Sequence, residues 1–94
     1  MENKTVFDTI VVGAGVVGTS IFNKLTRLGK KCLLIDKASD VATGVSKANS
    51  GIVHAGYDPE PGTMKAKMNV RGNKLYPSIC KRLGIKLNKC GALV

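Results

Sequence analysis

Apolar residues in the first third of the chain follow two spacings, which predict a strand, a helix and a second strand. Residues 6–12 form a largely apolar run with β-branched side chains, which is typical of a buried parallel strand. A helix is predicted from Gly15 to about Leu28, with Gly29 ending it. Residues 31–36 then predict the second strand. Four residues at helical spacing are expected to pack the helix on the sheet: Val17, Ile21, Leu25 and Leu28.

Beyond the second strand both spacings disappear, and a second helix follows only after a long loop. Residues 37–62 are rich in glycine, proline, serine and asparagine, yet they hold enough apolar side chains to argue against disorder. A loop of this length in a compact domain indicates a functional segment. The helical pattern returns over residues 63–84, where Pro77 is expected to kink or split the helix. Residues 86–94 predict the start of the next strands.

Three glycines and one acidic residue stand at the positions of a dinucleotide-binding βαβ unit. Gly13 lets the chain turn tightly, Gly15 leaves room for backbone N–H groups to approach a pyrophosphate, and Gly18 lets the helix lie close to the strand. Phosphates would lie at the helix N-terminus, where unpaired N–H groups and the macrodipole favour negative charge. Asp36 is placed to accept hydrogen bonds from an adenosine ribose. The expected fold class is therefore α/β, with residues 5–36 forming the βαβ portion of a Rossmann-like domain.

The chain holds one complete βαβ unit, whereas a doubly wound sheet needs several such units to cover both of its faces. We therefore expect residues 1–94 to be the amino-terminal fragment of a longer protein, truncated as the next strand begins. The alternative is a complete small protein whose last strand closes an edge of the sheet.

A net charge of +9, from 15 Lys and Arg against 6 Asp and Glu, raises the question of an anionic partner. The basic residues are spread along the chain and no aromatic residues alternate with them, so nucleic acid is not expected as a partner. Three cysteines without CxxC spacing fit a reducing, cytoplasmic setting and predict no metal site. The apolar stretch 10–22 is broken by glycines and is too short to span a bilayer, so no transmembrane segment is expected.

The long loop carries the side chains with the greatest chemical interest. Ser46, Asn49 and Ser50 can donate hydrogen bonds to phosphate and ring acceptors, and glycines at positions 44 and 51 allow close backbone approach. Such a loop favours a flavin that extends toward a substrate over an NAD(P) cofactor, which is the alternative. His54, the single histidine, either accepts the hydroxyl proton of an alcohol while hydride leaves for the flavin, or is a structural residue that orients the loop.

Three segments together resemble the start of a known enzyme family. They are residues 8–18 with Asp36, residues 49–62 and residues 65–69. These segments are similar to the D-amino-acid-oxidase-like family of FAD-dependent oxidoreductases, and specifically to its glycerol-3-phosphate oxidase/dehydrogenase branch. The Asn-Ser-Gly-x-x-His-x-Gly stretch of residues 49–56 is far more specific than the glycine turn. The resemblance implies a flavoprotein of glycerol metabolism with FAD as its cofactor.

The resemblance also implies a reaction. A small phosphorylated alcohol, sn-glycerol 3-phosphate, would be oxidised at its CH–OH group to dihydroxyacetone phosphate, with electrons passing to oxygen or a quinone. Peripheral membrane association of the full-length protein is compatible with this chemistry. The L-2-hydroxyglutarate dehydrogenase branch carries the same motif and is one alternative, although residues 57–61 favour the glycerol branch. A truncated nucleotide-binding remnant without activity of its own is another.

Site roles follow from the same resemblance, residue by residue. His54 would be the catalytic base. Asp36 stands where the family more often has glutamate, which shortens its reach to the ribose. The substrate-binding part of the family lies beyond position 94, so substrate choice is inferred from residues 54–62 alone. The residues implied to bind FAD are Gly13, Gly15, Val17, Gly18, Asp36, Val45, Ser46, Asn49, Ser50, Gly51 and Ile52.

Overall fold

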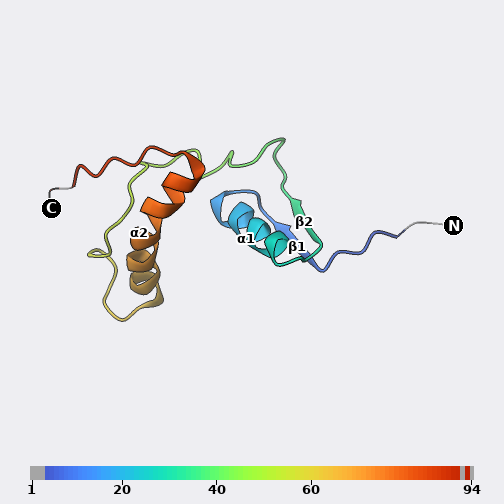
Figure 1. The fold of residues 1–94 in the computed structure, drawn as a ribbon, viewed down its shortest axis with the longest axis horizontal. Coiled ribbons are helices and arrows are strands. Elements are labelled where there is room, and N and C mark those ends of the chain that lie inside the picture. The colour runs from blue at the N-terminus through green and yellow to red at the C-terminus, as the bar shows by residue number, and fades with distance from the viewer. Residues whose placement is uncertain (1–3, 92, 94) are drawn as a thin grey trace. The chain divides into compact units, whose positions relative to one another are not determined.

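The computed structural model describes residues 4–91 and 93, which form two strands and two helices (Figure 1). In chain order these are β1 (Thr9–Val12), α1 (Val16–Arg27), β2 (Cys32–Ile35) and α2 (Met64–Leu83). The chain forms two compact units that divide between Ser50 and Gly51. The first unit therefore contains β1, α1 and β2, and the second contains α2.

The first unit is a βαβ arrangement in which β1 and β2 pair in parallel. The register places Thr9 opposite Cys32 and Val12 opposite Ile35. Both ends of this pairing are tied by further hydrogen bonds. Before the strands, Asp8 donates its N–H to Lys31 O and its carboxylate accepts from Lys31 N, each at 2.8 Å. After them, Gly13 N donates to Ile35 O at 2.7 Å. The expected α/β fold is confirmed, although both strands are shorter than the predicted ranges 6–12 and 31–36.

Helix α1 ends where the sequence predicts. Gly29 adopts a φ of 80°, the left-handed conformation in which glycine carries no Cβ penalty. The turn is closed by hydrogen bonds from Gly29 N to Thr26 O and from Lys30 N to Leu25 O, each at 3.0 Å. Basic side chains in the last turn complement the negative end of the helix dipole.

Gly18 brings α1 against the end of β1, and this contact decides which face of the helix meets the sheet. A Cβ on Gly18 would overlap the carbonyl oxygen of Gly13. The helix residues that are half-buried are accordingly Gly18, Thr19, Phe22 and Leu25. The predicted packing face is therefore wrong in part, because Val17 is 68 % and Leu28 62 % exposed while only Leu25 is half-buried. The close approach at Gly18 rotates the neighbouring apolar stripe, which includes Ile21, away from the strands.

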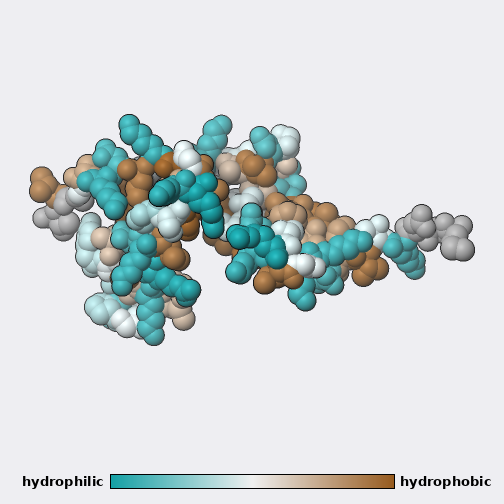
Figure 2. All heavy atoms as spheres, in the orientation of Figure 1, coloured by the Kyte–Doolittle hydropathy of each residue, from teal (hydrophilic) through white to brown (hydrophobic). Residues whose placement is uncertain are grey.

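Side chains alternate across the strands, so the two faces of the sheet differ. Val11 is buried beneath α1, whereas Ile10 and Val12 on the opposite face are 55 % and 79 % exposed. Figure 2 shows that hydrophobic residues lie at the surface among hydrophilic ones. Within the part of the chain that the structure describes, the buried apolar residues of this unit are Val11 and Ala14.

The second unit is built on α2. The hydroxyl of Thr63 caps its start by accepting from Ala66 N at 3.2 Å, and Gly84 ends it with a φ of 69°. Pro77 lies inside this helix. The prediction of a split is thus wrong. Proline lacks only the N–H that would donate to Asn73 O, and the helix continues because the neighbouring backbone hydrogen bonds still form.

The segment after α2 differs from its prediction. Residues 85–91 have no regular secondary structure, where the sequence predicted the next strands to begin. Strands require a hydrogen-bonded neighbour, and the described residues pair only as β1 with β2. Positions 92 and 94 of that prediction lie outside the described residues. Among the helices that are described, neither has the length and apolarity to cross a membrane.

Candidate functional site

The turn between β1 and α1 leads into a helix whose own first turn contains no acidic residue. Gly13 has a φ of 106°, which favours glycine, and Gly15 is the N-cap in extended conformation. Gly15 offers no side chain to cap the helix, and the first turn of α1 contains no acidic residue. The N–H groups of this turn and the positive end of the helix dipole are therefore directed at a site suited to an anion.

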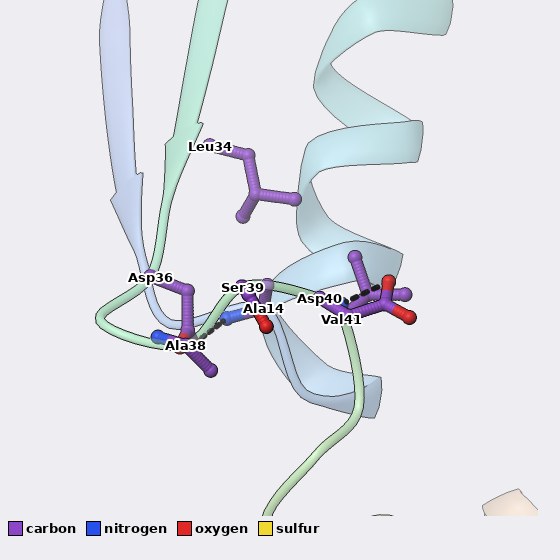
Figure 3. A pocket seen from close by; sticks show the side chains of 7 residues that line it. All are labelled: Ala14, Leu34, Asp36, Ala38, Ser39, Asp40 and Val41. Atoms are coloured by element: carbon purple, nitrogen blue, oxygen red, sulfur yellow. Dashed lines mark hydrogen bonds between the residues drawn. The ribbon is translucent and has the colours of Figure 1, made fainter.

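Asp36, directly after β2, joins this turn to the start of the following loop through its two carboxylate oxygens. Oδ2 accepts from Ala14 N at 2.8 Å and Oδ1 accepts from Ala38 N at 2.7 Å (Figure 3). The hydrogen bond from Ala14, followed by that from Ala38, lowers the pKa of Asp36 below its ordinary value of 3.8. A carboxylate has about four lone-pair positions, so it retains acceptor capacity for hydroxyl groups such as those of a ribose.

The lowered pKa of Asp36 predicts an acid-sensitive contribution to stability. A carboxyl group whose pKa is lower in the folded state stabilises the fold above its unfolded pKa, and this contribution disappears as pH falls through the folded pKa. We expect Asp36→Asn to lower the urea midpoint of the chain at neutral pH, with the difference from wild type shrinking below pH 3.8. Urea unfolding from about pH 6 to about pH 2 measures this. Asp40→Asn is the control, because that carboxylate bonds the adjacent Val41 N; a pH-independent difference for Asp36→Asn would contradict the prediction.

The loop after β2 folds back over the glycine turn. Ser46 Oγ accepts from Val16 N at 2.8 Å, in the first turn of α1. Ala42 N donates to Ala14 O at 2.8 Å, with Ala42 in the left-handed region at a φ of 55°. Asn49 Nδ2 closes the loop on itself by donating to the carbonyl oxygens of Val45 and Ser46 at 3.0 and 2.9 Å. Ser46 can still donate its own hydroxyl proton while it accepts from Val16.

A cavity of about 250 Å³ lies between the turn and the loop. A second cavity of about 250 Å³ adjoins it and shares Ala14, Asp36 and Ala38 (Figure 3). A Cβ on Gly15 would stand 3.2 Å from Ser46 Oγ, so a side chain there would intrude into the space between turn and loop. The lining combines the Asp36 carboxylate, small side chains and the Ser46 hydroxyl directly beside the start of α1, which suits a ribose and its phosphates. The residues that line the first cavity are Ala14, Gly15, Asp36, Lys37, Ala38, Thr43, Gly44, Val45 and Ser46.

His54 lies in the second unit, where its loop contacts α2. Its backbone carbonyl accepts from Asn73 Nδ2 at 3.2 Å, and the residue itself is exposed. Two residues later, Gly56 has a φ of 100°, and a Cβ there would stand 2.5 Å from Val70 Cγ2. The loop backbone is therefore held against one face of α2 close to His54.

The predicted site residues fall into two groups. The first unit brings together the three glycines of the turn, Asp36 and Ser46, with Val17 and Val45 exposed beside them and Asn49 bracing the loop. Gly51, Ile52 and His54 belong to the second unit, and Ser50 ends the first.

Sequence reasoning missed two kinds of contact. One is the main-chain donors of the turn, Ala14 and Val16, which have no side-chain signature. The other is Asn73, whose amide bonds the loop across 19 positions. In the sequence, Asn73 can be recognised only as a polar residue within the predicted helix.

Comparison with known proteins identifies a family to which this chain is similar. The family model named DAO, described as FAD dependent oxidoreductase, matches residues 8–94. The chain is 43% identical over 88 residues to a glycerol 3-phosphate dehydrogenase of Caloramator mitchellensis. It is 41% identical over 87 residues to a mitochondrial L-2-hydroxyglutarate dehydrogenase of Arabidopsis thaliana, and 38% identical over 88 residues to a glycerol 3-phosphate oxidase of Mycoplasma pneumoniae.

These similarities cover most of this chain and a small part of each relative. The alignments span 94%, 93% and 93% of the chain but 18%, 18% and 23% of the three relatives, respectively. The chain therefore corresponds to about a fifth of the length of the curated relatives that it matches.

Proposed function

Because this chain belongs to the DAO family of FAD-dependent oxidoreductases, we propose that it is the amino-terminal cofactor-binding part of an enzyme that oxidises sn-glycerol 3-phosphate to dihydroxyacetone phosphate. One observation carries the cofactor part of this proposal. Asp36, the glycine turn and Ser46 are joined by hydrogen bonds around a cavity that is lined by the Asp36 carboxylate, by Ala14 and Gly15 directly before α1, and by Ser46. This is the donor and acceptor set that the adenosine ribose and pyrophosphate of FAD require.

Each residue of the chain has a defined task in this proposal. Asp36 accepts from the ribose hydroxyls with the lone pairs that Ala14 and Ala38 leave. The first turn of α1 and the Ser46 hydroxyl bind the phosphates, and the loop of residues 49–52 continues toward the flavin. His54 takes up the proton of the substrate hydroxyl at an imidazole nitrogen. FAD, when bound, would accept the hydride that leaves the carbon bearing this hydroxyl.

The substrate is proposed from the relatives and from the loop that follows His54. Two of the relatives named above are glycerol 3-phosphate enzymes, and the third is an L-2-hydroxyglutarate dehydrogenase at nearly the same identity. Both substrates are secondary alcohols, so the role of His54 is the same for either. We propose the phosphorylated alcohol, with oxygen or a quinone as electron acceptor and the cytoplasm as the setting, and keep L-2-hydroxyglutarate as the second candidate.

Cofactor binding is testable on the 94-residue chain itself. We expect the chain to quench flavin fluorescence saturably when it is titrated against FAD, with no response to NAD or NADP. Gly15→Val should abolish the quenching, because its side chain fills the space beside Ser46 Oγ. Gly72→Ala is the control, since Gly72 lies in α2 outside the cavity lining and a Cβ at that position meets nothing within 4 Å.

Substrate choice is testable on the full-length protein. Turnover with sn-glycerol 3-phosphate should exceed turnover with L-2-hydroxyglutarate, measured as peroxide release and as dye reduction. The reverse preference would replace the proposed substrate by the second candidate. A full-length protein that binds FAD and turns over neither would contradict both proposed substrates, and one that carries no flavin would contradict the cofactor assignment.

A further inference from the structure

A side-chain hydrogen bond ties the loop that carries His54 to α2. Asn73 Nδ2 donates to the carbonyl oxygen of His54 at 3.2 Å, which joins residues 19 positions apart. The bond is made to the backbone, so it acts on the position from which the imidazole projects. Since a general base must lie within hydrogen-bond reach of the proton it removes, small displacements of that position matter.

A second contact holds the same stretch of loop. Gly56 approaches α2 so closely that a Cβ would stand 2.5 Å from Val70 Cγ2 and 3.6 Å from Val70 N. Val70 and Asn73 are three positions apart on the helix, so they lie on one face, one turn apart. The backbone of residues 54–56 therefore rests on this face at two points, one polar and one apolar.

Asn73 is the amide that makes the polar contact. Asn69, one turn earlier, also reaches this region, with its Oδ1 at 3.7 Å from the position of a Cβ on Gly56. Its Oδ1 is buried and accepts no hydrogen bond from the residues that the structure describes. The donor to His54 O is Asn73, and the side chain of Val70 is the surface on which Gly56 rests.

We infer that Asn73 is a positioning residue for His54, an inference that rests on the proposed role of His54 as the base. Its amide fixes the backbone carbonyl of His54 against α2, and the Gly56–Val70 contact prevents the loop from turning about that bond. A 1 Å displacement of a catalytic group can cost about 100-fold in rate. The loss of the Asn73 amide should therefore appear in kcat, while the first unit keeps its cofactor contacts.

The test is a double-mutant cycle in the full-length protein, with kcat expressed per bound flavin. We expect Asn73→Ala to lower kcat by about tenfold to about 100-fold, with little change in KM or in flavin absorbance. Asn73→Gln keeps a side-chain amide donor and should recover most of the turnover. Ser78→Ala, which removes a hydrogen bond made within α2 to Leu75 O, should leave kcat unchanged.

The His54→Ala background separates positioning from a general structural effect. If Asn73 acts through His54, adding Asn73→Ala to His54→Ala lowers kcat by less than about twofold, because coupled residues give non-additive losses. An equal loss in both backgrounds, or wild-type kcat for Asn73→Ala, would overturn the inference and leave His54 as the base. Full turnover by His54→Ala itself would overturn the proposed base and the positioning role together.

Discussion

Gly18→Ala is expected to cost the protein about 3 kcal/mol or more of its free energy of unfolding and to strip FAD from the full-length enzyme. The new Cβ would overlap the carbonyl oxygen of Gly13 and lie 2.9 Å from its carbonyl carbon. Both atoms are backbone, so no side chain can rotate away. Helix α1 must leave β1, and with it go the N–H groups that face the cofactor site.

Gly72→Ala is the matched control for this substitution. Gly72 is also inside a helix, and a Cβ there meets nothing within 4 Å. Since alanine has the higher helix propensity by about 1 kcal/mol, this variant should be as stable as wild type or slightly more so. Denaturation midpoints and flavin content of the two variants give the comparison. A Gly18→Ala protein that kept both would show that α1 can be displaced from β1 without consequence for the site.

His54→Ala is expected to lower turnover of the full-length, FAD-loaded protein by between about 100-fold and about 10,000-fold, which is the range of general-base contributions. Cofactor content should stay at the wild-type level, because the turn, Asp36 and Ser46 belong to the first unit while His54 belongs to the second. Loss of turnover with retained flavin would therefore locate the defect in proton transfer.

Chemical rescue distinguishes a missing base from a distorted loop. Added imidazole should restore part of the turnover of His54→Ala, since a small base can enter the space left by the side chain. It should do little for Asn73→Ala, in which the histidine is present but displaced. Near-wild-type turnover by His54→Ala would indicate that this residue has a structural role in the loop and is not the base.

Backbone conformation explains why the glycine turn could be predicted so fully from sequence. Gly13 needs a positive φ and Gly18 needs the absence of a Cβ, and both requirements restrict the residue type directly. The same holds for Gly29 and Gly84 at the ends of the two helices. In each case the local geometry excludes nearly every other residue type, so a glycine in the sequence indicates the conformation.

Contacts between segments that are distant in the chain are much harder to predict from the sequence. The apolar residues of α1 form two adjacent stripes, and the pattern alone did not show that Gly18 and Phe22, rather than Val17 and Ile21, would face the strands. The bond from Asn73 to His54 depends on the path of a loop that has no repeating pattern. Pro77 was predicted to kink or split the second helix, and the split does not occur because the loss of one hydrogen bond is offset by those around it.

The ties at both ends of the strand pair have a consequence for how such a domain can evolve. A slip of one residue would exchange the two faces of the sheet, yet here Asp8 with Lys31 and Gly13 with Ile35 hold the alignment through main-chain and carboxylate bonds. The alignment therefore does not depend on what covers Ile10 and Val12. Substitutions on that face can therefore accompany changes in whatever packs on it without shifting the register that places the cofactor turn.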